Sequence, residues 1–385
     1  MYSLLLAIIY LAFISLGLPD SLLGSGWPVM HTDFNVPISY MGIITMTISG
    51  CTIISSLLSN KLTHKFNTSI VTVGSVLLTA IALFCFSIST NFWMLLLWSI
   101  PYGLGAGSID AALNNYVALH YSSKHMSWLH CFWGVGTIIS PFVMSYSLAT
   151  SIWNTGYRII AFIQFGIALV LFLTLPLWKV NQSSNQSSTT EKSIGIIEAL
   201  KIKGVPFLLL GFFAYCSAEA TAMGWASTYF VEVKNISEQL AAAFASLLFI
   251  GLTIGRFLGG FLMDKLGDRK MIILGTILTI CGIICLFLPF SNNSITLIGF
   301  IMIGFGFAPI YPCIIHSTPA NFGAEHSGAI IGIQMASAYI GSTFMPPIYG
   351  ILGKSIGFHI MPVFLLLFIL LMIIMIEKTF HITTK

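Results

Sequence analysis

Three acidic residues of this chain lie where a carboxylate is unfavourable, within long apolar segments. They are Asp20, Asp110 and Glu219. A charged side chain at the centre of a membrane-spanning helix costs about 2.5–3.5 kcal/mol on insertion scales, so such groups are usually paired, protonated or facing water. In those surroundings an acid can bind hydroxyl groups or carry a proton. We therefore predict that the three acids couple protons to substrate movement; the alternative is a purely structural role between helices.

The segment around Asp110 places small and polar residues on one helical face. Gly103, Gly107, Asp110 and Asn114 follow one another at i, i+4, i+7 and i+11, which puts them in one stripe of a helix. The glycines allow a neighbouring helix to approach closely. The acid and the amide supply hydrogen-bonding groups, so we predict that Asp110 and Asn114 bind substrate.

A similar face is expected in the first apolar segment. Asp20, Gly24, Trp27 and His31 share the same spacing and would lie on one side of a continuous helix. A carboxylate accepts protons from sugar hydroxyls, and an aromatic ring covers the C–H surface of a sugar. Trp27 is therefore a predicted substrate contact, with a place in the interfacial aromatic belt as the alternative.

Other apolar segments contain further candidate residues. In the segment that contains Glu219, Gly224 could break the helix and turn Trp225 toward a cavity. Arg256 is expected to snorkel to the membrane surface, and pairing with a carboxylate is its alternative. The remaining candidates can either contact a substrate or hold helices together: His130, Gln164 and Gln334.

The composition is that of a polytopic membrane protein. Of 385 residues, 57% are hydrophobic and only 7% are charged, which excludes an ordinary soluble domain. The cysteines lie in apolar segments, and Cys281 and Cys285 have no neighbouring His or carboxylate that would complete a metal site. No nucleophile motif or phosphate-binding loop is present either. We predict no metal, no cofactor and no enzymatic activity.

Twelve apolar segments are long enough to span a bilayer. They cover approximately residues 2–30, 38–60, 68–88, 92–119, 126–149, 156–178, 204–231, 239–262, 270–290, 294–318, 327–352 and 358–377. If both termini are cytoplasmic, the inner loops hold twelve Lys and Arg residues and the outer loops hold three. This is a clear positive-inside bias. The predicted fold is an all-α membrane protein of two six-helix bundles with cytoplasmic termini.

A polar, low-complexity stretch begins at residue 181 and divides the chain into halves. Such a sequence cannot form a core. We predict an N-terminal bundle over residues 1–180, a cytoplasmic linker over 181–203 and a C-terminal bundle over 204–385. Apolar residues at 194, 197 and 200 indicate a short helix on the membrane surface, with a plain linker as the alternative.

The loop after the eighth segment has a distinctive pattern of glycines and charges: Gly260, Asp264, Gly267, Arg269 and Lys270. This pattern resembles the signature loop of the major facilitator superfamily, and the loop after the second segment repeats its spacing in a degraded form. The resemblance implies that the substrate binds at mid-membrane between two bundles. It also implies a gate, in which Asp264 meets the start of the fifth helix near residues 125–127. A simple topogenic basic loop is the alternative.

Four glycine-rich stretches narrow the resemblance: 17–28, 103–115, 215–225 and 304–312. Together they resemble the fucose permease branch, which takes up hexoses by proton symport. That branch has acids in the first and fourth helices, which match Asp20 and Asp110, and an asparagine that matches Asn114. Where the fucose permease has Glu, this chain has Asp110, so the identity of the sugar does not carry over.

These features predict a secondary transporter that takes up a hexose or related small sugar with protons, or with sodium. Asp110 would bind the sugar and Asp20 would carry the proton, with the reverse assignment as an alternative. The expected setting is a monomer in the lipid of a bacterial-type cell membrane, with no nucleic-acid partner. A proton antiporter that exports drugs or other amphipathic compounds is the second candidate, because 30 phenylalanines could line an apolar pocket. A nutrient sensor is disfavoured by the short linker.

Overall fold

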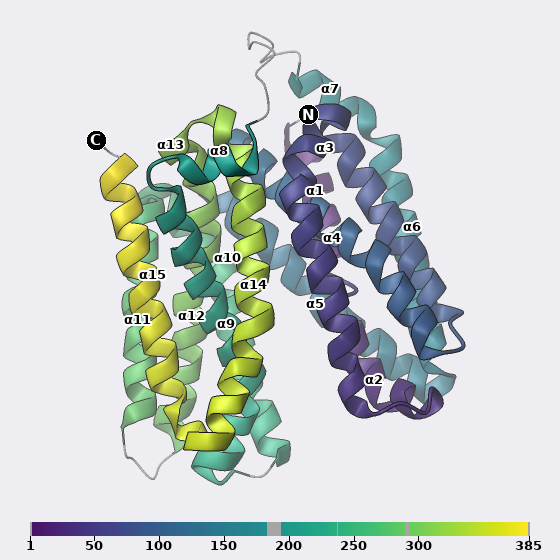
Figure 1. The fold of residues 1–385 in the computed structure, drawn as a ribbon, viewed down its shortest axis with the longest axis vertical. Coiled ribbons are helices and arrows are strands. Elements are labelled where there is room, and N and C mark those ends of the chain that lie inside the picture. Colours follow the sequence, from purple (N-terminus) through teal and green to yellow (C-terminus); the bar gives the residue numbers. More distant parts are fainter. Residues whose placement is uncertain (1, 183–193, 237, 289–292, 384–385) are drawn as a thin grey trace. The chain divides into compact units, whose positions relative to one another are not determined.

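A computed structural model describes residues 2–182, 194–236, 238–288 and 293–383, which form helices joined by short turns (Figure 1). In chain order the elements are α1 (Tyr2–Gly17), α2 (Leu22–Asp33), η1 (Ile38–Tyr40), α3 (Met41–Ser87), α4 (Phe92–His120), α5 (Ser123–Thr150), α6 (Trp153–Leu173), α7 (Leu175–Gln182), α8 (Ile196–Lys201), α9 (Val205–Lys234), α10 (Glu238–Leu266), α11 (Asp268–Phe287), α12 (Asn293–His316), α13 (Thr318–Phe322), α14 (Ala324–Ile356), η2 (Phe358–Ile360) and α15 (Met361–Thr383). The predicted all-α class is confirmed.

The number of membrane spans follows from one interruption in the longest helix. Among the described residues, eleven helical segments are long and apolar enough to cross a membrane. One of them contains α3, whose 47 residues include Asn67 with φ 65° and ψ 153°. These angles lie far outside the α region, so α3 is two consecutive helices. The described part of the chain therefore has twelve spans, as predicted.

The first span is interrupted, whereas a continuous helix was predicted. α1 ends at Gly17 and α2 begins at Leu22, with Pro19 and Asp20 in the turn between them. Proline has no N–H to donate and clashes with the preceding helical turn, which gives a local reason for the break. The prediction that Asp20 shares a continuous helical face with Trp27 is therefore wrong.

The described chain divides into two compact units. The N-terminal unit consists of Met1–Tyr116 and Leu129–Ile194, and the C-terminal unit consists of Val117–Trp128 and Gly195–Lys385. The turn between α4 and α5, with the adjoining ends of both helices, thus packs as part of the C-terminal unit. We call residues 117–128 the α4–α5 hairpin.

Each unit has its own helix packing. In the N-terminal unit α3 packs extensively against α6, and in the C-terminal unit α12 packs against α10 and α11 while α9 packs against α14 and α15. The short helices α8 and α13 lie at the end of the C-terminal unit where the chain terminates (Figure 1). A helix was predicted from the sequence at α8, and it is present. Residues 183–193 of the predicted linker lie outside the described residues.

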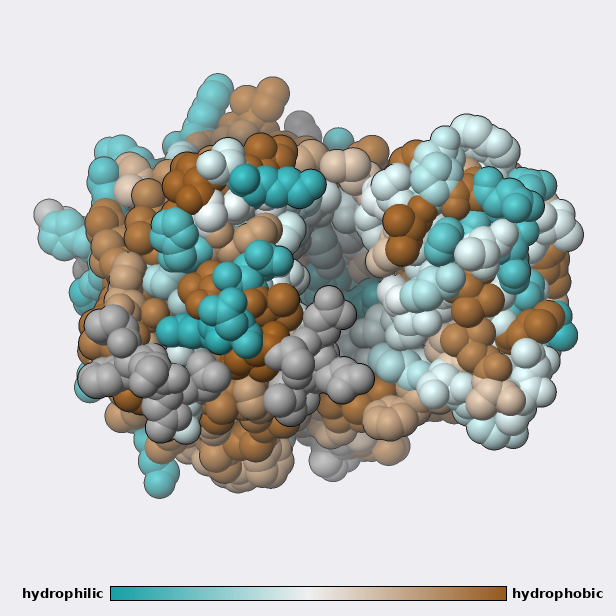
Figure 2. Space-filling model, turned by 90° about the horizontal axis from the view of Figure 1, so that it is seen from below, coloured by the Kyte–Doolittle hydropathy of each residue, from teal (hydrophilic) through white to brown (hydrophobic). Residues whose placement is uncertain are grey.

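The outer flanks of the helices are apolar. On α15, the side chains of Val363, Leu367, Leu370 and Ile374 are between 43% and 60% exposed. A row of this kind is unusual on a water-soluble monomer and is expected against lipid tails. In a view onto the helix ends, polar residues gather on the end of the C-terminal unit, at the left, and brown apolar residues surround its outer edge (Figure 2). The multi-pass membrane prediction is confirmed.

Candidate substrate and proton sites

Asp20 is held by two ring donors from other helices of the N-terminal unit. The hydroxyl of Tyr102, on α4, donates to Oδ1 at 3.1 Å, and the indole N–H of Trp133, on α5, donates to Oδ2 at 2.9 Å. The Asp20 side chain is nevertheless exposed. A carboxylate has about four lone-pair sites, so acceptor capacity remains for a ligand. The result is an exposed carboxylate flanked by an indole and a phenol.

Close backbone contact with α5 positions this turn. A Cβ atom at Gly17 would collide with the carbonyl oxygen of Trp133, and one at Gly136 would collide with the backbone of α1. The hydroxyl of Ser140 donates to the carbonyl oxygen of Leu18. Glycine at the crossing allows two helix backbones to touch, so α5 and the end of α1 are fastened together at several points.

The second acid belongs to a buried hydrogen-bonded chain. Nδ2 of Asn114 donates to Oδ1 of Asp110 at 2.8 Å, and Nε2 of His130, on α5, lies 3.1 Å from Oδ1 of Asn114. Asp110 is 4% exposed, Asn114 0% and His130 5%. The ring of Phe13 meets His130 edge-on, with centroids 5.4 Å apart. Burial disfavours an ionised carboxylate, which suits this site to proton binding.

The glycines beside Asp110 have the packing role that their spacing predicts. A Cβ atom at Gly103 would collide with the carbonyl oxygen of Ile48, and one at Gly107 with that of Thr52. Both partners belong to α3, so α4 lies directly against that helix. The predicted close approach of a neighbouring helix is confirmed.

The third acid, Glu219 on α9, is paired with a cation. Its Oε1 lies 3.3 Å from Nη2 of Arg256, on α10, and 2.8 Å from the hydroxyl of Tyr215. The side chains of Arg256 and Glu219 are only 6% and 14% exposed. Arg256 therefore forms the carboxylate pair that was the alternative, and the expectation of snorkelling is wrong. The predicted helix break at Gly224 is also wrong, because α9 continues through it.

The two tryptophans in the predicted substrate set use their indole N–H groups within the protein. Trp27 is 2% exposed and donates to the carbonyl oxygen of Ile38 at 2.7 Å. Trp225 donates to the carbonyl oxygen of Pro346 at 2.9 Å and stacks on Phe358. These contacts favour roles in packing. The aromatic residues beside Asp20 are instead Trp133 and Tyr102, neither of which was predicted from the sequence. The local signal for Trp133 is the glycine at position 134 and again at 136.

The two predicted glutamines are buried between helices. Gln164 accepts a hydrogen bond from the hydroxyl of Ser15 at 2.7 Å and donates to the carbonyl oxygen of the same residue at 2.6 Å. Oε1 of Gln334 accepts from the hydroxyl of Thr318 at 3.1 Å. Both glutamines are 0% exposed. For Gln164 the alternative of helix-to-helix hydrogen bonding is favoured. Nε2 of Gln334 has no hydrogen-bond partner among the described residues, so its contacts do not decide between the two roles.

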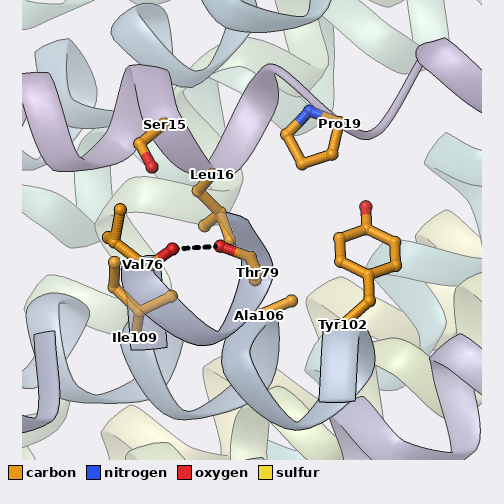
Figure 3. Close-up of a pocket in the computed structure, with 8 residues that line it drawn as sticks. All are labelled: Ser15, Leu16, Pro19, Val76, Thr79, Tyr102, Ala106 and Ile109. Carbon is orange, nitrogen blue, oxygen red and sulfur yellow. Dashed lines mark hydrogen bonds between the residues drawn. The ribbon is translucent and has the colours of Figure 1, made fainter. Parts of the chain in front are cut away.

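A small cavity lies beside the Asp20 turn. Its volume is about 10 Å³. Residues from α1, the turn, α3 and α4 line it (Figure 3): Ser15, Leu16, Pro19, Val76, Thr79, Tyr102, Ala106 and Ile109. The hydroxyl of Thr79 donates to the carbonyl oxygen of Val76, as the dashed line in Figure 3 shows. A cavity of this size has room for about one water molecule, so it is not a sugar site.

The signature-loop residues meet the α4–α5 hairpin inside the C-terminal unit. Oδ1 of Asp264 accepts a hydrogen bond from the backbone N–H of Lys124 at 3.3 Å, one residue before the stretch predicted to receive it. A helix start favours a nearby carboxylate. A Cβ atom at Gly260 would lie 2.6 Å from Nε1 of Trp128, so glycine permits this side chain to sit against α10.

The other loop residues shape the turn from α10 to α11. Gly267 has φ +77°, a conformation that favours glycine. The guanidinium of Arg269 donates to both carboxylate oxygens of Glu377, on α15, at 3.2 and 2.5 Å. Lys270 is exposed.

A further polar cluster at this end was not predicted. Nδ1 of His316, at the end of α12, lies 2.7 Å from Oδ2 of Asp268, and the hydroxyl of Ser123 donates to Oδ1 of Asp268 at 2.5 Å. Nε2 of His316 lies 3.0 Å from the carbonyl oxygen of Tyr121. The cluster ties the α4–α5 hairpin to α11 and α12. No local spacing could have indicated it, because its members come from three distant segments.

Comparison with known proteins places these features in a family. The model of the Major Facilitator Superfamily matches residues 9–253 and again 208–384. "Bypass of stop codon protein 6" of Saccharomyces cerevisiae is 22% identical, over 96% of this chain and 80% of the relative. The glucose/mannose transporter GlcP of Bacillus subtilis is 23% identical, over 79% of this chain and 77% of the relative. Other matching relatives are named for multidrug resistance and cis,cis-muconate transport.

Solved structures share the whole architecture. The transporter FucP in its outward conformation superimposes with a TM-score of 0.81 at 18% identity, covering 97% of this chain and 98% of that one. A second structure, described as the E. coli fucose:proton symporter FucP, gives a TM-score of 0.78 at 19% identity, with 98% of both chains covered. At these identities the likeness shows the fold.

Proposed function

Because the chain belongs to the Major Facilitator Superfamily, we propose that it takes up a hexose or a related small sugar together with protons. It is a multi-pass secondary transporter of a small molecule, and not an enzyme. The choice of sugar and proton is supported by the names of the relatives GlcP and FucP. The monomeric state, the cytoplasmic termini and the bacterial-type membrane belong to the proposal.

The observation that carries the proposal is the environment of Asp20. Its exposed carboxylate is bonded to the indole of Trp133 and the hydroxyl of Tyr102. A carboxylate that retains acceptor sites can take protons from two sugar hydroxyls, and a neighbouring indole offers an apolar face to the sugar's C–H groups. The sequence-based pairing of carboxylate and tryptophan is retained, with Trp133 in place of Trp27.

Burial supports a reversal of the roles expected for the two acids. Asp20 is exposed, whereas Asp110 is 4% exposed and bonded to Asn114. A ligand must reach its carboxylate, while a proton carrier must bring its charge into a costly environment and lose it on protonation. We therefore assign the sugar to Asp20 and the proton to Asp110. The chain through Asn114 to His130 would orient Asp110.

Glu219 and the signature loop have roles other than sugar binding and proton transfer. The cation of Arg256, 3.3 Å from Glu219, favours the charged form of this acid, and protonation would leave the cation unpaired. Glu219 is therefore the least suited of the three acids to carry a proton. Asp264, on α10, accepts a hydrogen bond from the start of α5; it would hold the α4–α5 hairpin against α10 and act as one gate of an alternating-access cycle.

The test is uptake by the purified chain in proteoliposomes. A panel of labelled hexoses and pentoses is offered with and without an imposed proton gradient, and with sodium as a separate arm. We expect one or more hexoses to accumulate only when the outside is more acidic. Accumulation driven by a sodium gradient alone would contradict the proposal that protons are the coupling ion. No sugar uptake, together with proton-driven extrusion of amphipathic cations, would favour the multidrug antiporter.

A further inference from the structure

We propose that α5 links the sugar site to the α4–α5 hairpin, and that Trp133 is the positioning residue through which Asp20 acts on it. The inference rests on the proposed function for its meaning, because Asp20 is taken as the sugar-binding acid. Its structural basis is independent of which substrate is carried.

Three polar contacts follow one another along α5 at intervals of three residues. The hydroxyl of Ser127 donates to the carbonyl oxygen of Arg256 at 2.6 Å. His130 bonds to Asn114, and Trp133 donates to Asp20. One short stretch of helix thus touches the residue that pairs with Glu219, the chain that orients Asp110, and Asp20 itself. Each contact lies within a single unit, and the continuous backbone of α5 joins them.

The helix is built to transmit a displacement over this stretch. α5 is continuous from Ser123, and the proline inside it, Pro141, comes after all three contacts. The Asp20 turn is fastened to α5 by the close backbone approach at Gly17 and by the hydrogen bond from Ser140. Because a packed helix moves as a rigid element, a shift of the turn is passed along α5 toward its start.

The start of α5 is held by the short hydrogen bond from Ser123 to Asp268 and by two longer contacts, which a small shift would break. The backbone N–H of Lys124 meets Asp264, and Nε1 of Trp128 donates to the carbonyl oxygen of Phe257 at 3.2 Å. The first of these is already long for a hydrogen bond. The hairpin is therefore the end of α5 that is best placed to respond.

Whether a sugar occupies the Asp20 carboxylate would determine how strongly Asp20 holds Trp133, and through it α5. A hydrogen bond from the Trp133 indole to an ionised carboxylate is stronger than one to a neutral group. Sugar hydroxyls that bind the remaining lone pairs of the same oxygens share the negative charge, so each hydrogen bond to the carboxylate becomes weaker. Occupation of Asp20 thus weakens its hold on Trp133, and the α4–α5 hairpin loosens in consequence.

The experiment is amide hydrogen exchange on the full-length protein in lipid nanodiscs, read on peptides that cover residues 117–128. The variants are Asp20→Ala, Trp133→Phe and the double variant. We expect each single change to speed exchange of hairpin amides about fivefold, which corresponds to about 1 kcal/mol, the contribution of one hydrogen bond. The double variant should exchange no faster than either single variant, since both remove the same link.

The chain offers a matched control in Trp153. Its indole donates to Oδ2 of Asp33 at 2.7 Å within the same unit, but it lies on α6. Trp153→Phe and Asp33→Ala should leave exchange at the hairpin unchanged. If Trp133→Phe does not fold, the comparison of Asp20→Ala with Asp33→Ala gives the same answer.

Three results would overturn the inference: unchanged exchange at residues 117–128 in Asp20→Ala, additive effects in the double variant, or an equal effect in the controls. Sugar uptake is measured separately on the same preparations. If the unmodified protein takes up no sugar but the variants show the expected exchange pattern, the proposed function alone is refuted. Intact sugar uptake with an unresponsive hairpin would refute the role of Trp133 alone.

Discussion

The acids of the two units are stabilised in opposite ways. In the N-terminal unit Asp20 is held by the neutral donors Tyr102 and Trp133, and Asp110 by the neutral amide of Asn114. In the C-terminal unit Glu219 faces the guanidinium of Arg256. A carboxylate among neutral donors can lose its charge without leaving a cation behind. A carboxylate in a buried ion pair cannot, because protonation leaves its partner uncompensated. The difference teaches that the N-terminal unit is suited to changes of charge and the C-terminal unit to a constant one.

The largest effect should come from breaking the ion pair. Arg256→Gln leaves Glu219 buried without its cation, which should lower the free energy of unfolding by about 3–5 kcal/mol. Pairing it with Glu219→Gln should recover most of the loss. Denaturant unfolding in detergent measures both variants. As a control, Arg269→Gln breaks an ion pair whose side chains are 53% and 32% exposed and should cost about 0.2–1 kcal/mol. A small loss for Arg256→Gln would break the comparison.

The next effect concerns Asp20. Asp20→Asn keeps the shape but removes a charged acceptor, so sugar binding should weaken by about 1.5–3 kcal/mol, or roughly ten- to a hundredfold in Kd. Direct binding of labelled sugar to the purified protein is the measurement. Unfolding stability should change far less than in Arg256→Gln, because no buried charge is left unpaired. Unaltered sugar affinity would move the binding role away from this acid.

Asp110→Asn should separate coupling from exchange. The neutral amide cannot bind and release a proton, so a gradient of one pH unit should no longer drive sugar accumulation, a loss of about 1.4 kcal/mol for one proton per sugar. Exchange of sugar between equal pools should continue. Proteoliposomes with and without the gradient report the two activities. Persistent uphill accumulation would assign the proton to another group and undo the division of roles between Asp20 and Asp110.

The smallest effect should come from the signature loop. Asp264→Asn weakens the contact with the start of α5 by about 0.3–2 kcal/mol, enough to shift a balanced conformational equilibrium. Spin labels at Leu119 and Leu274, both exposed in the C-terminal unit, should then show a broader and longer distance distribution. An unchanged distribution would remove Asp264 from the gate.

Much of the fold could be predicted because it depends on properties local in sequence. Apolar length indicated the twelve spans. The spacing of Gly103 and Gly107 indicated close contact with a neighbouring helix, which the structure identifies as α3. The presence of three acids in membrane segments was equally evident. Hydropathy and helical period act over one or a few turns, so they can be read without knowing which helices meet.

The partners of those acids were decided by tertiary structure. Pro19 interrupts the first span, which removes Asp20 from the face of Trp27, and packing brings in Trp133 from 113 residues away. Arg256 is 37 residues from Glu219, and its pairing depends on how α9 and α10 are rotated. The sequence by itself determined that charges enter the membrane. Only packing decided which neighbour each one meets, because a helical face has no preferred partner until the helices are placed together.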